Sequence, residues 1–140
     1  MNRFWRARGL FVAVAAAILI GGGCAKRVQF DSLPLAQSGS ATARIQLTYD
    51  RNNTLEIKLS EVPVPAEVKP NYNRYVLWVA TPDRQHVINA GQLRVTENSK
   101  AEIRTLTPLR HFILFITAET SGDVFTPGPD VVFQTEEIRW

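Results

Sequence analysis

The chain has 140 residues, with 16 lysines and arginines, 13 acidic residues and one cysteine. This length fits one domain that can build a core without disulfides, and a single cysteine excludes an intramolecular bridge. A basic excess points to nucleic acid or an anionic surface, but Arg3, Arg6 and Arg8 account for all of it. The remaining 13 basic residues balance the 13 acidic ones. They form no cluster with interleaved aromatic residues, so we expect no nucleic-acid binding.

The first 23 residues are arranged like a secretory signal peptide. A head with three arginines and no acidic residue precedes the uninterrupted apolar stretch Leu10–Ile20, and three glycines follow. Signal peptides combine such a head with roughly 7–15 apolar residues and a small-residue exit. A membrane-spanning helix needs about 20 apolar residues, so an uncleaved signal anchor is the weaker alternative. We expect residues 1–23 to be a signal helix that is removed.

The end of this segment, "IGGGC" from Ile20 to Cys24, resembles the lipobox of bacterial lipoproteins. The resemblance implies cleavage between Gly23 and Cys24, with palmitate-type acyl chains on the Cys24 thiol and on the new amino group. It departs from the family at Gly21, where leucine is usual. Two or more acyl chains give stable anchoring. Ala25 after the cysteine implies forwarding to the periplasmic face of the outer membrane in bacteria with two membranes; a free thiol at Cys24 is the alternative.

Residues 24–42 are expected to be the lipidated cysteine followed by a flexible linker. The part from Ala36 to Thr42 is small and polar, which is typical of a coil. A coil of about 17 residues spans roughly 20–25 Å, which would lift a domain off the lipid surface. The alternative is that "VQF" and "LPL" dock on the domain as an edge strand.

From residue 43 onward, apolar and polar residues alternate as in half-buried strands. Ile45, Leu47 and Tyr49 fall on one face of the first segment, and "TLEIKLS" repeats the pattern. The sequence between them, Asp50–Asn53, has turn chemistry because Asn and Asp tolerate positive φ. We therefore predict a β-hairpin.

The rest of the chain reads as short strands separated by turns. Three prolines from Pro63 to Pro70 exclude a central strand and predict a crossover loop. Tyr75–Ala80 and "RHFILFITAE" are apolar on both faces, and a glycine break is expected at Gly91. About seven to eight short antiparallel strands predict an all-β, immunoglobulin-like β-sandwich over residues 43–140, or a small barrel. We expect Trp78 to fill the centre of the core, with ligand stacking as the alternative.

Three stretches resemble the extracytoplasmic β domain of anti-sigma-K-type membrane regulators. They are "YVLWVATPDRQHVINAGQL", "FILFITAE" and "TPGPDVVF", and they fall within Tyr75–Phe133. The resemblance implies a β domain outside the cytoplasm and a place in an extracytoplasmic signalling system. Those regulators carry a sigma-binding domain before their membrane helix, whereas nine residues precede the apolar stretch here. We therefore do not expect anti-sigma activity itself.

The sequence contains no recognisable catalytic or metal-binding constellation. His86 and His111 are isolated, and zinc needs three or four clustered ligands. Ser121–Asp123 reads as a turn, and Glu136 and Glu137 would point to opposite faces of a strand. We expect no enzymatic activity, no cofactor and no metal.

Three functions are compatible with these features. The first is a membrane-anchored envelope lipoprotein whose sandwich is a protein-binding or assembly module for an envelope protein. It predicts an exposed apolar patch near Val62–Pro70 or Phe125–Pro129. The others are an accessory or sensor of an anti-sigma-like signalling system, and a purely structural envelope lipoprotein. Trp140 is expected either to cover the end of the domain or to touch a partner. The binding module is the function we predict.

Overall fold

The computed structural model describes residues 24–140, so the predicted signal helix and Gly23 lie outside the described residues. Nearly all regular structure in the described chain is β. The strands are β1 (Ala25–Gln29), β2 (Asp31–Ser32), β3 (Ser40–Leu47), β4 (Asn53–Ser60), β5 (Arg74–Ala80), β6 (Val87–Leu93), β7 (Ala101–Thr107), β8 (His111–Glu119), β9 (Val131–Gln134) and β10 (Ile138–Arg139). A 3-10 turn, η1 (Pro34–Ala36), and a short helix, α1 (Pro65–Val68), lie between them. Within this range no helix has the length and apolar character to cross a membrane.

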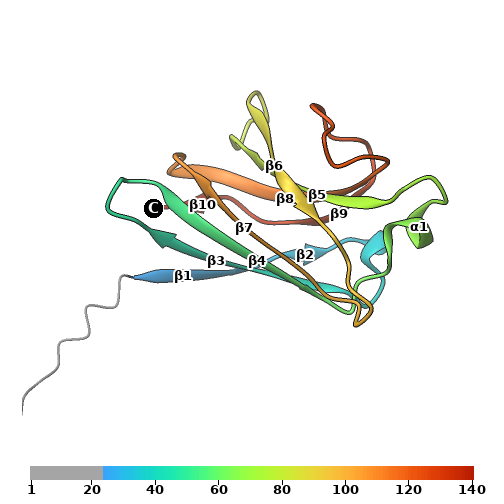
Figure 1. Ribbon diagram of the computed structural model, residues 1–140. Helices are drawn as coiled ribbons and strands as arrows, with labels where there is room; N and C mark the ends of the chain where they lie inside the picture. The colour runs from blue at the N-terminus through green and yellow to red at the C-terminus, as the bar shows by residue number, and fades with distance from the viewer. Residues whose placement is uncertain (1–23) are drawn as a thin grey trace, which may run out of the picture.

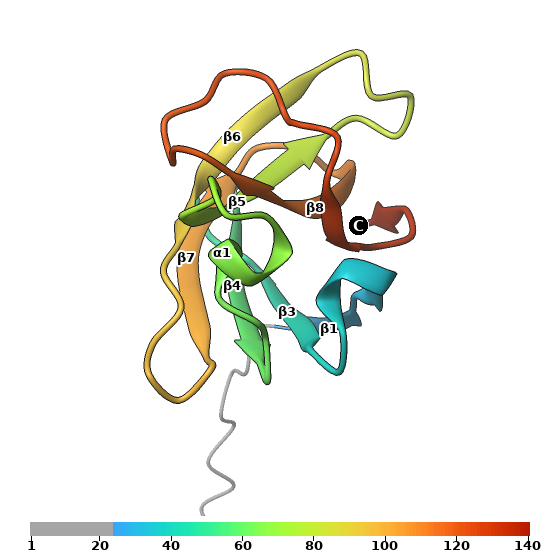
Figure 2. The ribbon, with the colours of Figure 1, turned by 90° about the vertical axis from the view of Figure 1, so that its right-hand side faces the viewer.

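The strands form two antiparallel sheets in two layers (Figures 1 and 2). One sheet has the order β1-β3-β4-β7, and the other has the order β2-β9-β8-β5-β6 with β10 added beside β8. The predicted all-β class is confirmed, and so is the hairpin, in which Leu47 lies opposite Asn53 at the last pair before the turn. The described residues form ten strands, because β1, β2 and β10 add to the predicted set.

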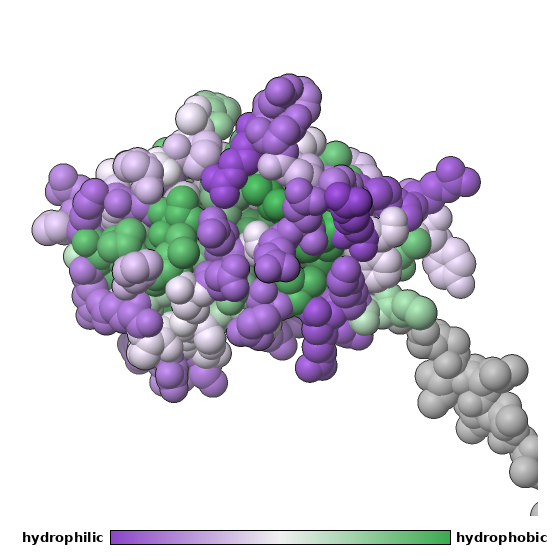
Figure 3. Space-filling view, turned by 180° about the vertical axis from the view of Figure 1, so that it is seen from behind, coloured by the Kyte–Doolittle hydropathy of each residue, from purple (hydrophilic) through white to green (hydrophobic). Residues whose placement is uncertain are grey.

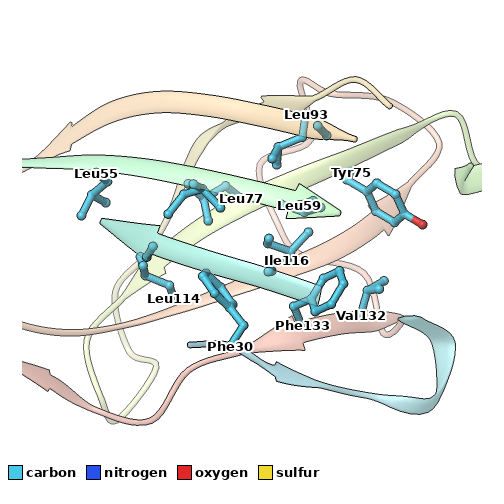
Figure 4. Close-up of a cluster of buried hydrophobic side chains, with 14 of the residues drawn as sticks. Phe30, Leu55, Leu59, Tyr75, Leu77, Leu93, Leu114, Ile116, Val132 and Phe133 are labelled. Carbon is cyan, nitrogen blue, oxygen red and sulfur yellow. The ribbon is translucent and has the colours of Figure 1, made fainter. Parts of the chain in front are cut away.

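The main core lies between the sheets and explains the alternation in the sequence. The four-stranded sheet contributes Ile45, Leu55 and Ile57 to this core. They pack against Leu77 and other buried side chains of the six-stranded sheet. Figure 4 shows this cluster, with Leu59, Leu93, Leu114, Ile116 and Phe133 among its members. Burying such side chains contributes about 1.5–3 kcal/mol each, which makes this interface the main source of stability.

The second face of β5 builds a smaller cluster on the outside of the six-stranded sheet. Trp78 belongs to it, together with Val76, Ala80, Ile113 and Phe115. The Trp78 ring stacks on Phe115 at 6.3 Å between centroids. The expectation that Trp78 fills the centre of the main core is therefore wrong, although the side chain is fully buried. Val124 and Val131 from the following loop and strand cover this cluster, so β5 is buried on both faces.

The flexible linker predicted for residues 24–42 is also wrong. The alternative of a docked edge strand holds for Val28 and Gln29 in β1, whereas "LPL" leads into the 3-10 turn η1. β1 pairs with β3 from Ala25 onward, and β2 pairs with β9 in the other sheet. Phe30, between the two strands, is buried in the main core with 3 % of its surface exposed. Burial of this ring and of Ala36 offsets the loss of chain entropy that would keep a polar segment disordered. The folded domain begins at Ala25, not at residue 43.

Gly91 does not break the strand that contains it. β6 runs through it, with a register shift opposite Leu77 and Trp78 that marks a β-bulge. Gly91 has a φ of 129°, a conformation that residues with a side chain rarely adopt. A bulge raises the local twist of a strand, so this glycine lets β6, an outer strand of its sheet, continue past the register shift.

Candidate functional site

Cys24 is exposed and stands immediately before the first strand. The antiparallel ladder of β1 and β3 sets Ala25 opposite Gln46, which places Cys24 beside Leu47. β1 is an outer strand of its sheet, so the thiol projects from a corner of the sandwich rather than from its core. A substituent on this sulfur would therefore leave the packing of the domain unchanged.

Four segments meet at this end of the sandwich, which we call the anchor end. They are Cys24–Lys26, Leu47–Asn53, 106–111 and 138–140. Leu47 pairs with Asn53, and Asn53 pairs with Thr107. On the other side, Arg139 pairs with His111, so the C-terminus lies here too (Figure 1). Lys26 Nζ donates to the carbonyl of Arg139 at 3.4 Å, which links β1 to the C-terminal strand.

The turn of the β3–β4 hairpin is held by its own side chains. The Asp50 carboxylate accepts hydrogen bonds from the Thr48 hydroxyl, from the Asn52 backbone at 3.2 Å and from the Asn52 amide at 2.9 Å. These bonds, that of Thr48 first, lower the pKa of Asp50. Arg51 takes a φ of 65°, as turn residues commonly do. A turn fixed in this way presents Tyr49 to solvent with its side chain fully exposed (109 %).

Exposed apolar and basic side chains share the anchor end. The apolar ones are Leu47, Tyr49, Leu106 and Trp140. The exposed basic ones are Lys26, Arg51, Arg110 and Arg139, against the acidic residues Asp50, Glu136 and Glu137. The Glu137 carboxylate already has two partners, because His111 Nε2 lies 2.9 Å and Arg139 Nη2 3.0 Å from the same oxygen. The hydrogen bond of His111, and secondly that of Arg139, lower the pKa of Glu137. The anchor end is thus positive overall, with aromatic and aliphatic tips.

A second feature is a charged row across the outer face of the four-stranded sheet, which we call the arginine row. Arg27 lies opposite Arg44, Arg44 opposite Glu56, and Glu56 opposite Arg104. The row borders a shallow depression that reaches Lys58. Lys58 Nζ lies 3.2 Å from Glu56 and lowers the pKa of that carboxyl. Like charges directly opposite on a sheet are unfavourable, so Arg27 and Arg44 are placed at some cost in stability.

The histidines, the serine and the paired carboxylates considered as catalytic candidates do not lie together in one site. His86 is exposed in the turn after β5, and His111 is paired with Glu137 at the anchor end. Ser121 donates to Asp123 within a turn, and Glu136 and Glu137 precede β10. Within residues 24–140, no group of three or more His, Cys, Asp and Glu side chains could hold a metal ion.

The proline-rich loops carry less exposed apolar surface than predicted. Val62 and Pro65 are buried, whereas Val64 and Phe125 (95 %) are exposed. On the face seen in Figure 3, apolar surface is broken up by hydrophilic side chains. Lys69 Nζ binds the Asp130 carboxylate at 2.6 Å, and the Tyr72 hydroxyl donates to the same group. These contacts fasten the loop before β9 to the loop after α1.

The loop before β9 is also held by a chain of hydrogen bonds that begins at the buried Trp78. Trp78 Nε1 donates to the Thr117 hydroxyl at 2.8 Å, and Thr117 donates to Glu119 at 2.6 Å. Glu119 accepts a further bond from the Gly128 backbone at 2.7 Å. The indole N–H of Trp78 therefore has a hydrogen-bond acceptor within the protein, which makes the burial of this side chain favourable.

Sequence reasoning singles out Cys24 as the predicted acylation site, and it does not single out Tyr49 or the arginine row. Tyr49 continues the alternation of β3 in the sequence, but the strand ends at Leu47. The exposed arginines of the row stand at outward positions of their strands. The alternation of apolar and polar residues could have indicated the outward position of each arginine, but not that the arginines lie in one row. Comparisons of the chain with protein-family models, curated proteins and solved structures gave no match.

Proposed function

We propose that this protein is a lipid-anchored envelope lipoprotein that presents its β-sandwich as a protein-binding or assembly module. The observation that carries the proposal is the position of Cys24. It is the only cysteine of the chain, it is exposed, and it directly precedes the first strand. Together with "IGGGC", this supports cleavage after Gly23 and acylation of Cys24. Ala25 at the next position favours the periplasmic face of the outer membrane.

The arginine row supports the binding part of the proposal. Glu56, the acidic residue of the row, lies between Arg44 and Arg104, and Arg27 lies on the far side of Arg44. Arginine forks bind carboxylates in two parallel hydrogen bonds, and a partner carboxylate between Arg27 and Arg44 would relieve their repulsion. The partner that fits this face is an envelope protein with an acidic surface. Opposite charges across an interface mainly raise the association rate and the specificity.

We also propose that the sandwich is a variant of the immunoglobulin-like class. The N-terminal strands β1 and β2 contribute to different sheets, as in sandwiches whose strands switch sheets at a bend. With β1 and β2 set aside, β3, β4 and β7 take the places of strands A, B and E of the constant-type order, and β5, β8 and β9 take those of C, F and G. An experimental structure superposed on immunoglobulin domains would test this relation.

The anchoring is tested by the intact mass of the protein extracted from its native membrane, beside a Cys24→Ala variant. We expect the native protein to start at Cys24 and to be heavier by its acyl chains, and the variant to carry none. An unmodified full-length mass would overturn the proposal.

The binding is tested by crosslinking the anchored protein in that membrane. We expect Arg27→Glu with Arg44→Glu to lose a crosslinked protein that Arg94→Glu retains, since Arg94 is exposed but lies outside the row. Equal crosslinking in the two variants would show that the arginine row is not the binding face.

A further inference from the structure

The chain leaves no spare length between Cys24 and the folded domain. β1 begins at Ala25 and is fixed to β3 by five residue pairs. Each residue of extended chain reaches at most about 3.6 Å, so an acyl group on Cys24 holds the corner of the sandwich at the lipid surface. A flexible linker of the predicted length would have separated the two by roughly 20–25 Å.

The β3–β4 turn extends beyond Cys24 in the direction of the anchor. Cys24 is beside Leu47, the last residue of β3, and the turn Thr48–Asn52 follows it. Each headgroup layer of a bilayer is about 5–7 Å thick. A cysteine held at the surface by its acyl chains therefore brings this turn to the depth of the headgroups.

The side chains at this depth are those that such an interface favours. Tyr49 is fully exposed on a turn that is closed by its own hydrogen bonds, and Trp140 is 37 % exposed at the C-terminus. Tyrosine and tryptophan concentrate at lipid–water boundaries, because one end of each ring is apolar and the other forms hydrogen bonds.

The charge of the anchor end is complementary to an anionic membrane. Lys26, Arg51, Arg110 and Arg139 outnumber Asp50, Glu136 and Glu137 by one, although the chain without its first 23 residues has balanced charge. Each lysine or arginine near an anionic leaflet contributes about 1 kcal/mol of attraction. The positive end is thus the end at which the chain would enter the membrane.

We infer that the anchor end rests on the phospholipid surface itself, with Tyr49 and Trp140 among the headgroups and the basic residues against lipid phosphates. The inference rests on the proposed acylation of Cys24. It gives the domain a fixed orientation, in which the loop that carries Phe125 points away from the bilayer (Figure 1).

The test uses the full chain processed in its host, with Tyr49→Cys or Phe125→Cys as matched variants at two exposed aromatic positions. An acylated Cys24 has no free thiol, so each variant takes up one thiol-reactive fluorophore per chain. The labelled proteins are reconstituted in vesicles of phosphatidylglycerol and phosphatidylcholine, and nitroxide lipids or aqueous iodide serve as quenchers. We expect the label at position 49 to be quenched by nitroxide lipid several-fold more than the label at position 125, with the reverse order for iodide.

Equal quenching at the two positions, with one label per chain, would overturn the inference and leave the anchoring intact. A label at position 49 that is shielded from both quenchers would mean that a second copy occupies this end, which also overturns it. Two labels per chain would show a free Cys24 and overturn the proposed anchoring instead. Brominated lipids give a second readout without a new cysteine: they should quench Trp140 and lose most of their effect in Trp140→Phe, because Trp78 is buried.

Discussion

Arg27 and Arg44 lie directly opposite one another on neighbouring strands, and both are exposed on the outer face of the four-stranded sheet. The next residue across the sheet from Arg44 is Glu56. Glu56 pairs with Lys58 at 3.2 Å, so the carboxylate next to Arg44 is already engaged, and Arg27 faces the like charge of Arg44. The repulsion between Arg27 and Arg44 therefore lowers the free energy of unfolding of the domain. Denaturation of charge variants can measure this loss.

The variant Arg27→Glu is expected to be more stable than the wild type. It replaces a repulsive cross-strand pair with an attractive one, a change of roughly 0.2–1 kcal/mol. Urea denaturation at low salt measures it, and the gain should shrink at high salt because exposed charges are screened. Arg27→Gln, which removes the repulsion alone, should give a smaller gain. A loss of stability in both variants would show that the Arg27 stem contributes more by packing than its charge costs.

The variant Thr117→Val is expected to be less stable by about 1–3 kcal/mol. It leaves Trp78 Nε1 buried without an acceptor and removes one donor from Glu119, and an unpaired buried polar group costs about this amount. Urea denaturation followed by tryptophan fluorescence gives the free energy of unfolding. Thr105→Val, on the partly exposed β7, is the matched control and should change it little. Equal effects in the two variants would contradict a special role for the buried chain of bonds.

The contact of Asp130 with Lys69 and Tyr72 predicts an acid-sensitive contribution to stability. The Lys69 ammonium, and secondly the Tyr72 hydroxyl, lower the pKa of Asp130. A carboxyl with a lowered pKa in the folded state stabilises the fold fully above its unfolded value of about 3.9, and loses this effect as the pH falls through the folded value. Lys69 is more than half exposed, so solvent screening keeps the effect modest.

The variant Asp130→Asn should therefore be less stable than the wild type at pH 7, with a gap that closes below about pH 4. Denaturation midpoints over a pH series measure the gap. In a Lys69→Met background the gap should be smaller at pH 7, because the ammonium beside Asp130 is then absent. A gap of constant size from neutral to acid pH would assign the effect of Asp130 to packing instead of charge.

The variant Gly91→Ala is expected to be destabilised by more than about 1 kcal/mol. Its φ of 129° is unfavourable for any residue with a side chain, and an added Cβ would lie 2.4 Å from Ile103 Cδ1. The double variant Gly91→Ala with Ile103→Val removes that methyl group and separates the two causes. Partial recovery of the thermal midpoint would assign the remainder to backbone strain, and full recovery would show that strain contributes nothing.

Local patterns were sufficient for the strands with one buried face. Ile45, Leu55 and Ile57 alternate with polar residues, so both the hairpin and the inward face could be predicted. The same rule fails for β5, because a strand that is apolar on both faces does not reveal which face meets the other sheet. Trp78 was assigned to the wrong cluster for that reason. It also fails at Tyr49, where the alternation continues past the end of the strand.

The candidate site was predictable only where it is encoded in consecutive residues. Cys24 and the glycines before it form a local motif. The arginine row depends on the register of β1, β3, β4 and β7, and a shift of one residue would turn each side chain to the other face. The docking of residues 25–30 depends on the burial of Phe30 by strands far along the chain. Composition alone suggested a linker there because most neighbouring residues are small or polar.

The strand that begins beside Cys24 also decides how the domain bears mechanical load. If Cys24 is acylated as proposed, a force on it that pulls along β1 meets antiparallel hydrogen bonds perpendicular to the strand, so the ladder with β3 resists in shear, with its bonds loaded together. Behind that ladder, Phe30 connects β1 to β2 and thus to the second sheet. Such a force would therefore be transmitted to both sheets of the folded domain and not to a linker that could stretch first.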